Sequence, residues 1–250
     1  MRRWGLPAAV LAALIGLWQV AASSGALADL LNLERFLVPS PAEIGEALWQ
    51  ERSLLADNAW VTFQEVLLGF LCAAAAGTSF ALALHLSATL RRAFYPLIVA
   101  SQTIPIPAVA PILVVLFGYG IGPKLAIVAL IAFFPIAVNS LDGLRSVDPE
   151  AIKMMRSLDA SRAQLLWRVE APTALPFFFS GAKIAVAISV IGAVFGEWAG
   201  ANSGLGHQIL LDNANLQTAR MFAAVAVLSA ISLSLFALLA LAERRVVTWR

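Results

Sequence analysis

The sequence predicts an all-α membrane protein, a polytopic bundle of about six transmembrane helices in a single domain. Of its 250 residues, 60% are hydrophobic and only 13% are charged, and the apolar residues gather in long runs. A soluble domain averages about 45–50% apolar and about 25% charged residues, so this chain has half the charge needed to cover a soluble surface. The single cysteine, Cys72, excludes a disulfide scaffold. A net charge of +2 is too small to indicate a nucleic-acid partner.

Six runs are long enough to cross about 30 Å of hydrocarbon, which takes roughly 20 mostly apolar residues. They lie at about 5–22, 61–86, 94–117, 125–141, 177–198 and 221–242. Residues 1–60 then form the N-terminal helix and an outer segment, and residues 61–242 form the core.

The basic residues predict the orientation of these spans. With the N-terminus in the cytoplasm, 12 of the 17 lysine and arginine residues fall on the inner side, four fall on the outer side and Lys183 lies within the fifth span. This excess is the positive-inside pattern, so we expect both termini in the cytoplasm. The inner residues are Arg2, Arg3, Arg91, Arg92, Arg145, Lys153, Arg156, Arg162, Arg168, Arg244, Arg245 and Arg250, and the outer ones are Arg35, Arg52, Lys124 and Arg220.

The first span has a second interpretation. The basic start Met1–Arg3, the apolar run and the small residues at 24–28 also fit a signal peptide with its cleavage site. The run is slightly long for that role, so we favour a retained helix. In either case the following segment lies outside, with a short helix over 42–50 that Ser40 caps and that has Pro41 in its first turn.

The long inner segment, residues 142–175, predicts a helix, a sharp turn and a second helix. Asp148 can cap the first helix, with Pro149 at its first position. Ser161 and Gln164 form a capping box for the second, which Pro172 and Pro176 should end. The product is a small amphipathic knob, although a plain connecting loop with interfacial helices is the alternative.

One run in this segment carries a family resemblance. It comprises Arg156, Ser157, Leu158, Asp159, Ala160, Ser161 and Arg162, with Val169, Leu175 and Pro176 at fixed distances beyond it. The run resembles the coupling-loop motif, or coupling helix, of the permease subunits of ATP-binding-cassette (ABC) importers. Two departures stand out: Lys153-Met154-Met155 replaces Glu-Ala-Ala, and Asp159 replaces a turn glycine. Because aspartate tolerates left-handed backbone better than most residues, we expect the turn to survive.

The resemblance extends over residues 37–242. Residues 101–122, 133–136 and 196–206 resemble permeases for nitrate, sulfonate, taurine and pyrimidine-type substrates, and residues 217–224 most resemble importers of the hydroxymethylpyrimidine precursor of thiamine. The resemblance implies a MetI-like, type I importer permease in a bacterial inner membrane. The implied partners are a second permease copy in a homodimer, an external substrate-binding protein and two cytoplasmic ATPase subunits that receive the knob.

The chain itself has no Gly-x-x-x-x-Gly-Lys-[Ser/Thr] phosphate loop. We therefore expect it to bind no cofactor, with ATP and Mg²⁺ held by the partner ATPases. His85 and His207 have no second histidine or cysteine at ligand spacing, so we predict no metal site. No nucleophile–base pair indicates catalysis, and we predict a transport subunit rather than an enzyme.

Some residues within the spans are candidates for a translocation path. Prolines free backbone carbonyls, which is tolerated where neighbours or a water-filled cavity satisfy them. The third span is therefore expected to line the path, although it could be only a kinked packing helix. Glu197 with Trp198 is either a path contact or an interfacial pair. The candidate path residues are Gln102, Pro105, Pro107, Pro111, Glu197 and Trp198.

The predicted function is thus the permease of a binding-protein-dependent importer of a small polar solute. The resemblance favours a thiamine-precursor pyrimidine, with a sulfonate, taurine or nitrate as alternatives. A stand-alone secondary transporter is a further alternative and would ideally show paired broken helices.

Overall fold

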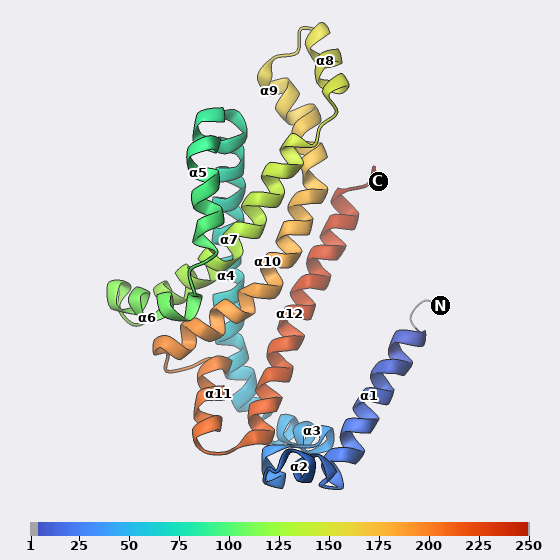
Figure 1. Ribbon diagram of the computed structural model, residues 1–250, viewed down its shortest axis with the longest axis vertical. Helices are drawn as coiled ribbons and strands as arrows, with labels where there is room; N and C mark the ends of the chain where they lie inside the picture. Colours follow the sequence, from blue (N-terminus) through green and yellow to red (C-terminus); the bar gives the residue numbers. More distant parts are fainter. Residues whose placement is uncertain (1–4, 250) are drawn as a thin grey trace. The chain divides into compact units, whose positions relative to one another are not determined.

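The computed structural model describes residues 5–249, which are helical with no strand in that range (Figure 1). Arg2, Arg3 and Arg250, three of the predicted inner basic residues, lie outside the described residues. Five helical segments are long and apolar enough to cross a membrane, and a bent helix pair makes a sixth if it counts as one span. The five are α1 (Gly5–Ser23), α4 (Arg52–Leu86), α7 (Ile121–Arg145), the segment Arg162–Gly200 that contains α10 (Ala171–Gly200), and α12 (Thr218–Val246). The predicted all-α membrane bundle is confirmed.

The third predicted span is broken rather than continuous. It consists of α5 (Ala88–Ser101) and α6 (Ile106–Phe117), which meet at 103°. Proline has no N–H group and disfavours helical geometry in the residue before it. Pro105 itself has an extended conformation as the N-cap of α6. Pro107 lies in the first turn of α6, where a proline is tolerated, and Pro111 lies inside the helix.

The chain divides into two compact units, which we describe separately. The first comprises the chain up to Val61 together with Ser203–Ser229. It contains α1, α2 (Ala26–Leu31), the 3-10 turn Arg35–Leu37, α3 (Pro41–Gln50) and α11 (Leu205–Ala214). As predicted, Ser40 caps α3, and the Glu43 carboxylate accepts from the Ser40 N–H at 2.6 Å to complete a capping box. The buried Asp212 carboxylate accepts a hydrogen bond from Arg220 at 2.8 Å.

The second unit comprises Thr62–Asn202 and the chain from Ala230 onward. Glycines let its long helices approach closely, as in other membrane bundles. A Cβ on Gly181 of α10 would lie 2.5 Å from the Pro135 carbonyl oxygen of α7. A Cβ on Gly69 of α4 would lie 2.5 Å from the Val128 side chain. α7 therefore packs closely against both α10 and the part of α4 in this unit.

Candidate functional site

The inner loop begins with α8 (Pro149–Ser157), whose start is the one predicted. The Asp148 carboxylate accepts from the Glu150 N–H at 2.9 Å, and Pro149 occupies the first turn. An aspartate at this position also stabilises the positive end of the helix dipole. Figure 1 shows α8 and the following α9 beyond the ends of α7 and α10, the two helices that the loop joins.

The turn after α8 depends on Asp159. Its φ is +54°, in the left-handed region that glycine usually occupies. Two backbone hydrogen bonds close the turn: Ala160 N–H donates to Met155 O at 3.1 Å, and Asp159 N–H donates to Arg156 O at 3.0 Å. This pair defines a Schellman C-cap. The expectation that aspartate supports a left-handed turn here is confirmed.

The second loop helix starts as predicted but does not end as predicted. α9 (Arg162–Leu165) has the Ser161–Gln164 capping box. It then continues through a π-helical turn, Leu166–Glu170, directly into α10. The prediction that Pro172 and Pro176 end this helix is wrong, because the helix continues through both: Pro172 directly follows the π-helical turn at the start of α10. Pro176 lies inside α10.

A buried carboxylate fastens the loop to α4. Glu170, the last residue of the π-helical turn, is 3% exposed. Its Oε1 accepts from Arg162 Nη1 at 2.6 Å, and its Oε2 lies 2.9 Å from His85 Nε2 near the inner end of α4. Arg162 Nη2 also lies 2.8 Å from that histidine nitrogen. Because buried charges need partners, this three-residue cluster holds one orientation of the loop base relative to α4.

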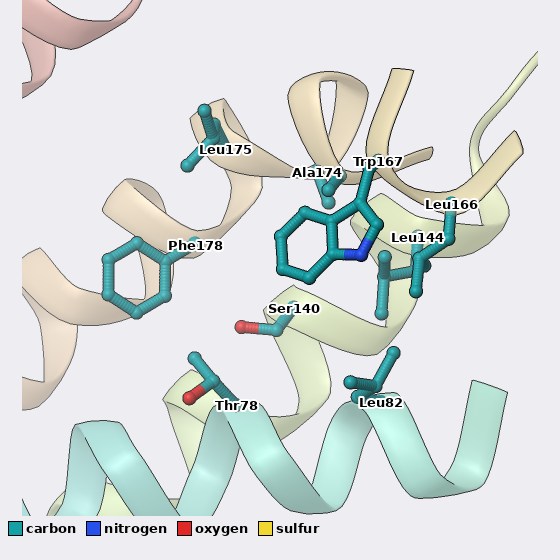
Figure 2. A pocket seen from close by; sticks show the side chains of 10 residues that line it. Thr78, Leu82, Ser140, Leu144, Leu166, Trp167, Ala174, Leu175 and Phe178 are labelled. Carbon is teal, nitrogen blue, oxygen red and sulfur yellow. The ribbon is translucent and has the colours of Figure 1, made fainter. Parts of the chain in front are cut away.

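The loop base also borders a small, open apolar pocket (Figure 2). The pocket has a volume of about 180 Å³. Leu166 and Trp167 of the π-helical turn contribute to its wall, together with Ser140 of α7 and Phe178 of α10. The buried Ser140 hydroxyl has no hydrogen-bond partner among the described residues. π-helical turns are rare and occur frequently at functional sites, and here one borders unfilled space.

Polar groups also join the helices near the predicted outer side. The Glu197 carboxylate, 1% exposed, accepts a hydrogen bond from Thr62 Oγ1 at 2.6 Å. One turn along α4, Glu65 pairs with Lys124 of α7 at 2.6 Å, and both side chains are buried. Trp198 is 44% exposed and stacks edge-to-face with Phe195. Within this chain, Glu197 thus ties α10 to α4.

Of the other candidate path residues, Gln102 and Pro105 lie at the break between α5 and α6, and Pro107 and Pro111 lie in α6. Gln102 lines a cavity at the break together with Ser101 and Ile106. Glu197 and Trp198 do not line that cavity.

Sequence reasoning missed the partners in these pairs. Glu65 and Lys124 are 59 positions apart, and His85 and Glu170 are 85 positions apart, so the sequence had no signal for either pairing. Lys183, which the sequence placed within the fifth span, donates to Glu243 of α12 at 2.7 Å.

The structure is thus a bundle of helices long and apolar enough to span a membrane, with one capped and anchored loop between α7 and α10. Residues 66–248 match the family model described as "Binding-protein-dependent transport system inner membrane component". The chain belongs to that family of ABC importer permeases.

Individual relatives agree with this assignment. The formylaminopyrimidine transport permease protein ThiX of Halalkalibacterium halodurans is 37% identical over 216 residues, 86% of each chain. The riboflavin transport system permease protein RibX of Chloroflexus aurantiacus is 36% identical over 247 residues, 98% of this chain and 90% of its own. Permeases named for taurine and for aliphatic sulfonates match at lower identity.

A solved structure of the MetNI methionine ABC transporter, in an inward-facing conformation, superposes with a TM-score of 0.68. The match covers 79% of this chain and 98% of that one at 20% identity. At this identity the match supports the fold alone, and it confirms the predicted MetI-like architecture.

Proposed function

We propose that this permease works in an ATP-driven, binding-protein-dependent importer and that residues 156–162 are its contact with a cytoplasmic ATPase subunit. The observation that carries the proposal is the apolar surface of an otherwise polar loop. Met154 is 60% exposed, and Leu158 and Trp167 are each 71% exposed. Large apolar side chains gathered on a charged loop mark an interaction site.

The anchoring of the loop supports a mechanical role. An ATPase subunit that moves this loop can transmit the movement to the spans only if the base of the loop is attached to them. The Glu170–His85 contact and the continuous helix from Arg162 into α10 provide two such attachments. Displacement of Leu158 by the ATPase would therefore move α10 and the inner end of α4 together.

The remaining components follow from the family. Two copies of the chain would form the path, with Gln102, Pro105, Pro107 and Pro111 lining it and Glu197 and Trp198 near its outer end. A substrate-binding protein would deliver the solute from outside, and the ATPases would hold ATP and Mg²⁺. The termini would lie in the cytoplasm. We favour a pyrimidine precursor of thiamine as substrate, with taurine, sulfonate or nitrate as alternatives.

Deleting residues 156–162 tests the coupling role. Uptake and co-purification of the ATPase subunit should be lost, while insertion in the membrane is retained. Because the deletion also removes the Arg162–Glu170 pair, a point variant is needed: Leu158→Asp keeps that pair and should weaken ATPase binding at least ten-fold.

Leu30→Asp is the matched control, since Leu30 is an exposed leucine of α2 in the other unit, and it should bind the ATPase normally. Normal ATPase association in both loop variants would refute this assignment of the loop. A stable native complex without any ATPase would instead favour a secondary transporter.

A further inference from the structure

The open pocket at the base of the inner loop lies where α4, α7, the π-helical turn and α10 meet, all within the second unit. Its walls are mainly leucine, alanine and aromatic side chains. The polar side-chain groups that line it are the hydroxyls of Thr78 and Ser140 and the indole N–H of Trp167. None of the lining residues carries a charge.

The Ser140 hydroxyl is a buried polar group that lacks a hydrogen bond. The residue is 5% exposed, and its Oγ has no partner among the described residues. By contrast, Thr78 Oγ1 donates to Ala74 O of its own helix at 2.6 Å. Figure 2 shows the Ser140 hydroxyl directed toward the gap between Phe178 and Thr78, inside the ring of lining side chains. Because an unpaired buried hydroxyl costs free energy, a molecule in the pocket that pairs with it would recover that cost.

The size of the pocket limits what this molecule can be. An engineered cavity of about 150 Å³ lined by leucine, isoleucine and phenylalanine stays dry and binds benzene. At about 180 Å³, the present pocket has room for one such ring with a small substituent, and its open side gives access. Trp167 and Phe178 both border it, so a ring would meet aromatic neighbours.

Other occupants match the walls less well. A buried water makes about three hydrogen bonds on average, whereas these walls offer few polar groups and Thr78 has already donated its proton. A lipid acyl chain would fill the apolar space but would leave the Ser140 hydroxyl unpaired. An aromatic ring that carries one hydroxyl group satisfies both the apolar walls and Ser140.

We propose that the pocket binds a single-ring aromatic molecule with one hydroxyl group, the monocyclic phenol class, and that Ser140 is its hydrogen-bond partner. Because such a molecule contacts α4, α7, the π-helical turn and α10 together, it stabilises the arrangement that the structure shows. Trp167 also belongs to the exposed apolar surface of the loop, so a bound phenol should slow coupled ATP hydrolysis. This regulatory role rests on the proposed function, whereas binding in the pocket does not.

The test measures binding to the full-length permease in nanodiscs, together with any ATPase subunit that co-purifies, by ligand-observed fluorine NMR. The probes are para-fluorophenol and fluorobenzene, which differ only in the hydroxyl group, and empty nanodiscs correct for uptake by lipid. para-Fluorophenol should bind saturably. Ser140→Ala should weaken its binding roughly three- to ten-fold, the effect of one hydrogen bond, and should leave fluorobenzene binding within about two-fold.

Two further variants control this comparison. Ser189→Ala is the matched control, because Ser189 is a buried serine of α10 whose hydroxyl donates to Ala185 O at 2.7 Å and which does not line the pocket. It should change the binding of neither probe. Leu82→Trp adds a large side chain at the pocket wall and should abolish binding of both. Since Ser140→Ala removes an unpaired hydroxyl, its thermal unfolding midpoint should not fall below that of wild type.

Three results would overturn the assignment of the pocket: no saturable binding of para-fluorophenol to wild type, undiminished binding in Leu82→Trp, or an equal effect of Ser140→Ala on both probes. Unchanged ATP hydrolysis at saturating para-fluorophenol would overturn the regulatory role. A native preparation that binds the phenol through Ser140 but contains no ATPase would instead refute the proposed importer function and leave the pocket intact.

Discussion

Asp159 sets the geometry of the inner loop by adopting a conformation that most residues avoid. Its positive φ allows the two hydrogen bonds that close the Schellman turn between α8 and α9. An L-residue in left-handed backbone costs roughly 1–2 kcal/mol, with aspartate among the better tolerated. A β-branched residue with positive φ is a genuine outlier. Comparing a β-branched substitution with a glycine substitution at position 159 therefore separates backbone strain from loss of the aspartate charge.

Asp159→Val should therefore open the turn. A cost of roughly 1–2 kcal/mol corresponds to a factor of about 5–30 in the opening equilibrium, and the Asp159 and Ala160 amides should exchange faster by that factor. Hydrogen–deuterium exchange of the peptide spanning 156–162 measures it. Asp159→Gly should leave exchange within a few-fold of wild type. Leu158→Val is the matched control, because Leu158 is adjacent to Asp159 and has a φ of −94°. If amide exchange were accelerated equally in that variant, backbone strain at Asp159 would not be the cause.

At the scale of elements, the close approach of α7 and α10 depends on residues without side chains. The nearest atom to a Cβ on Gly181 would be a backbone oxygen, which cannot rotate away as a flexible side chain can. That oxygen also accepts a hydrogen bond from Asn139 Nδ2 at 2.7 Å, which fixes it further. An added methyl group must therefore push the two helices apart.

We expect Gly181→Ala to destabilise the purified protein by about 1–3 kcal/mol, the usual cost of overpacking. Gly45→Ala is the control, since a Cβ there meets nothing within 4 Å. In the exposed interior of α3, alanine should instead stabilise by roughly 0.5–1 kcal/mol. Thermal unfolding midpoints of both variants in one detergent provide the comparison. A midpoint for Gly181→Ala at or above that of wild type would contradict this packing argument.

The helices and their contacts also show which features could be predicted from the sequence. The caps at Asp148 and Ser161 were predictable because their partners lie two or three residues away. The break at 102–105 was predicted only in part. The prolines indicated freed carbonyls, but the 103° bend depends on which residues pack beside it. The Glu170–His85 and Glu65–Lys124 contacts were not predictable, because they depend on how whole helices align in three dimensions.

Across the whole molecule, the distribution of the few charges carries most of the information about orientation. Charges within the spans are paired across helices: the buried Glu65 with Lys124, and the partly buried Lys183 with Glu243. Among the described residues, the lysine and arginine side chains without an ion pair are concentrated in segments that the positive-inside pattern assigns to the cytoplasm. The exposed, partly apolar loop around Leu158 lies in one of these segments, as the proposed ATPase contact requires.

This orientation predicts which cysteines an impermeant reagent can reach. The native Cys72 is first replaced by alanine. Single cysteines are then introduced at two exposed positions: Leu158→Cys in the predicted inner loop, and Leu216→Cys in the turn between α11 and α12. In intact spheroplasts without the ATPase partner, a membrane-impermeant maleimide should label Leu216→Cys only. After permeabilisation both should react, which controls for accessibility. Labelling of Leu158→Cys from outside would invert the orientation. Because the proposed ATPase partner would be cytoplasmic, the same result would also rule out the proposed coupling role of the loop.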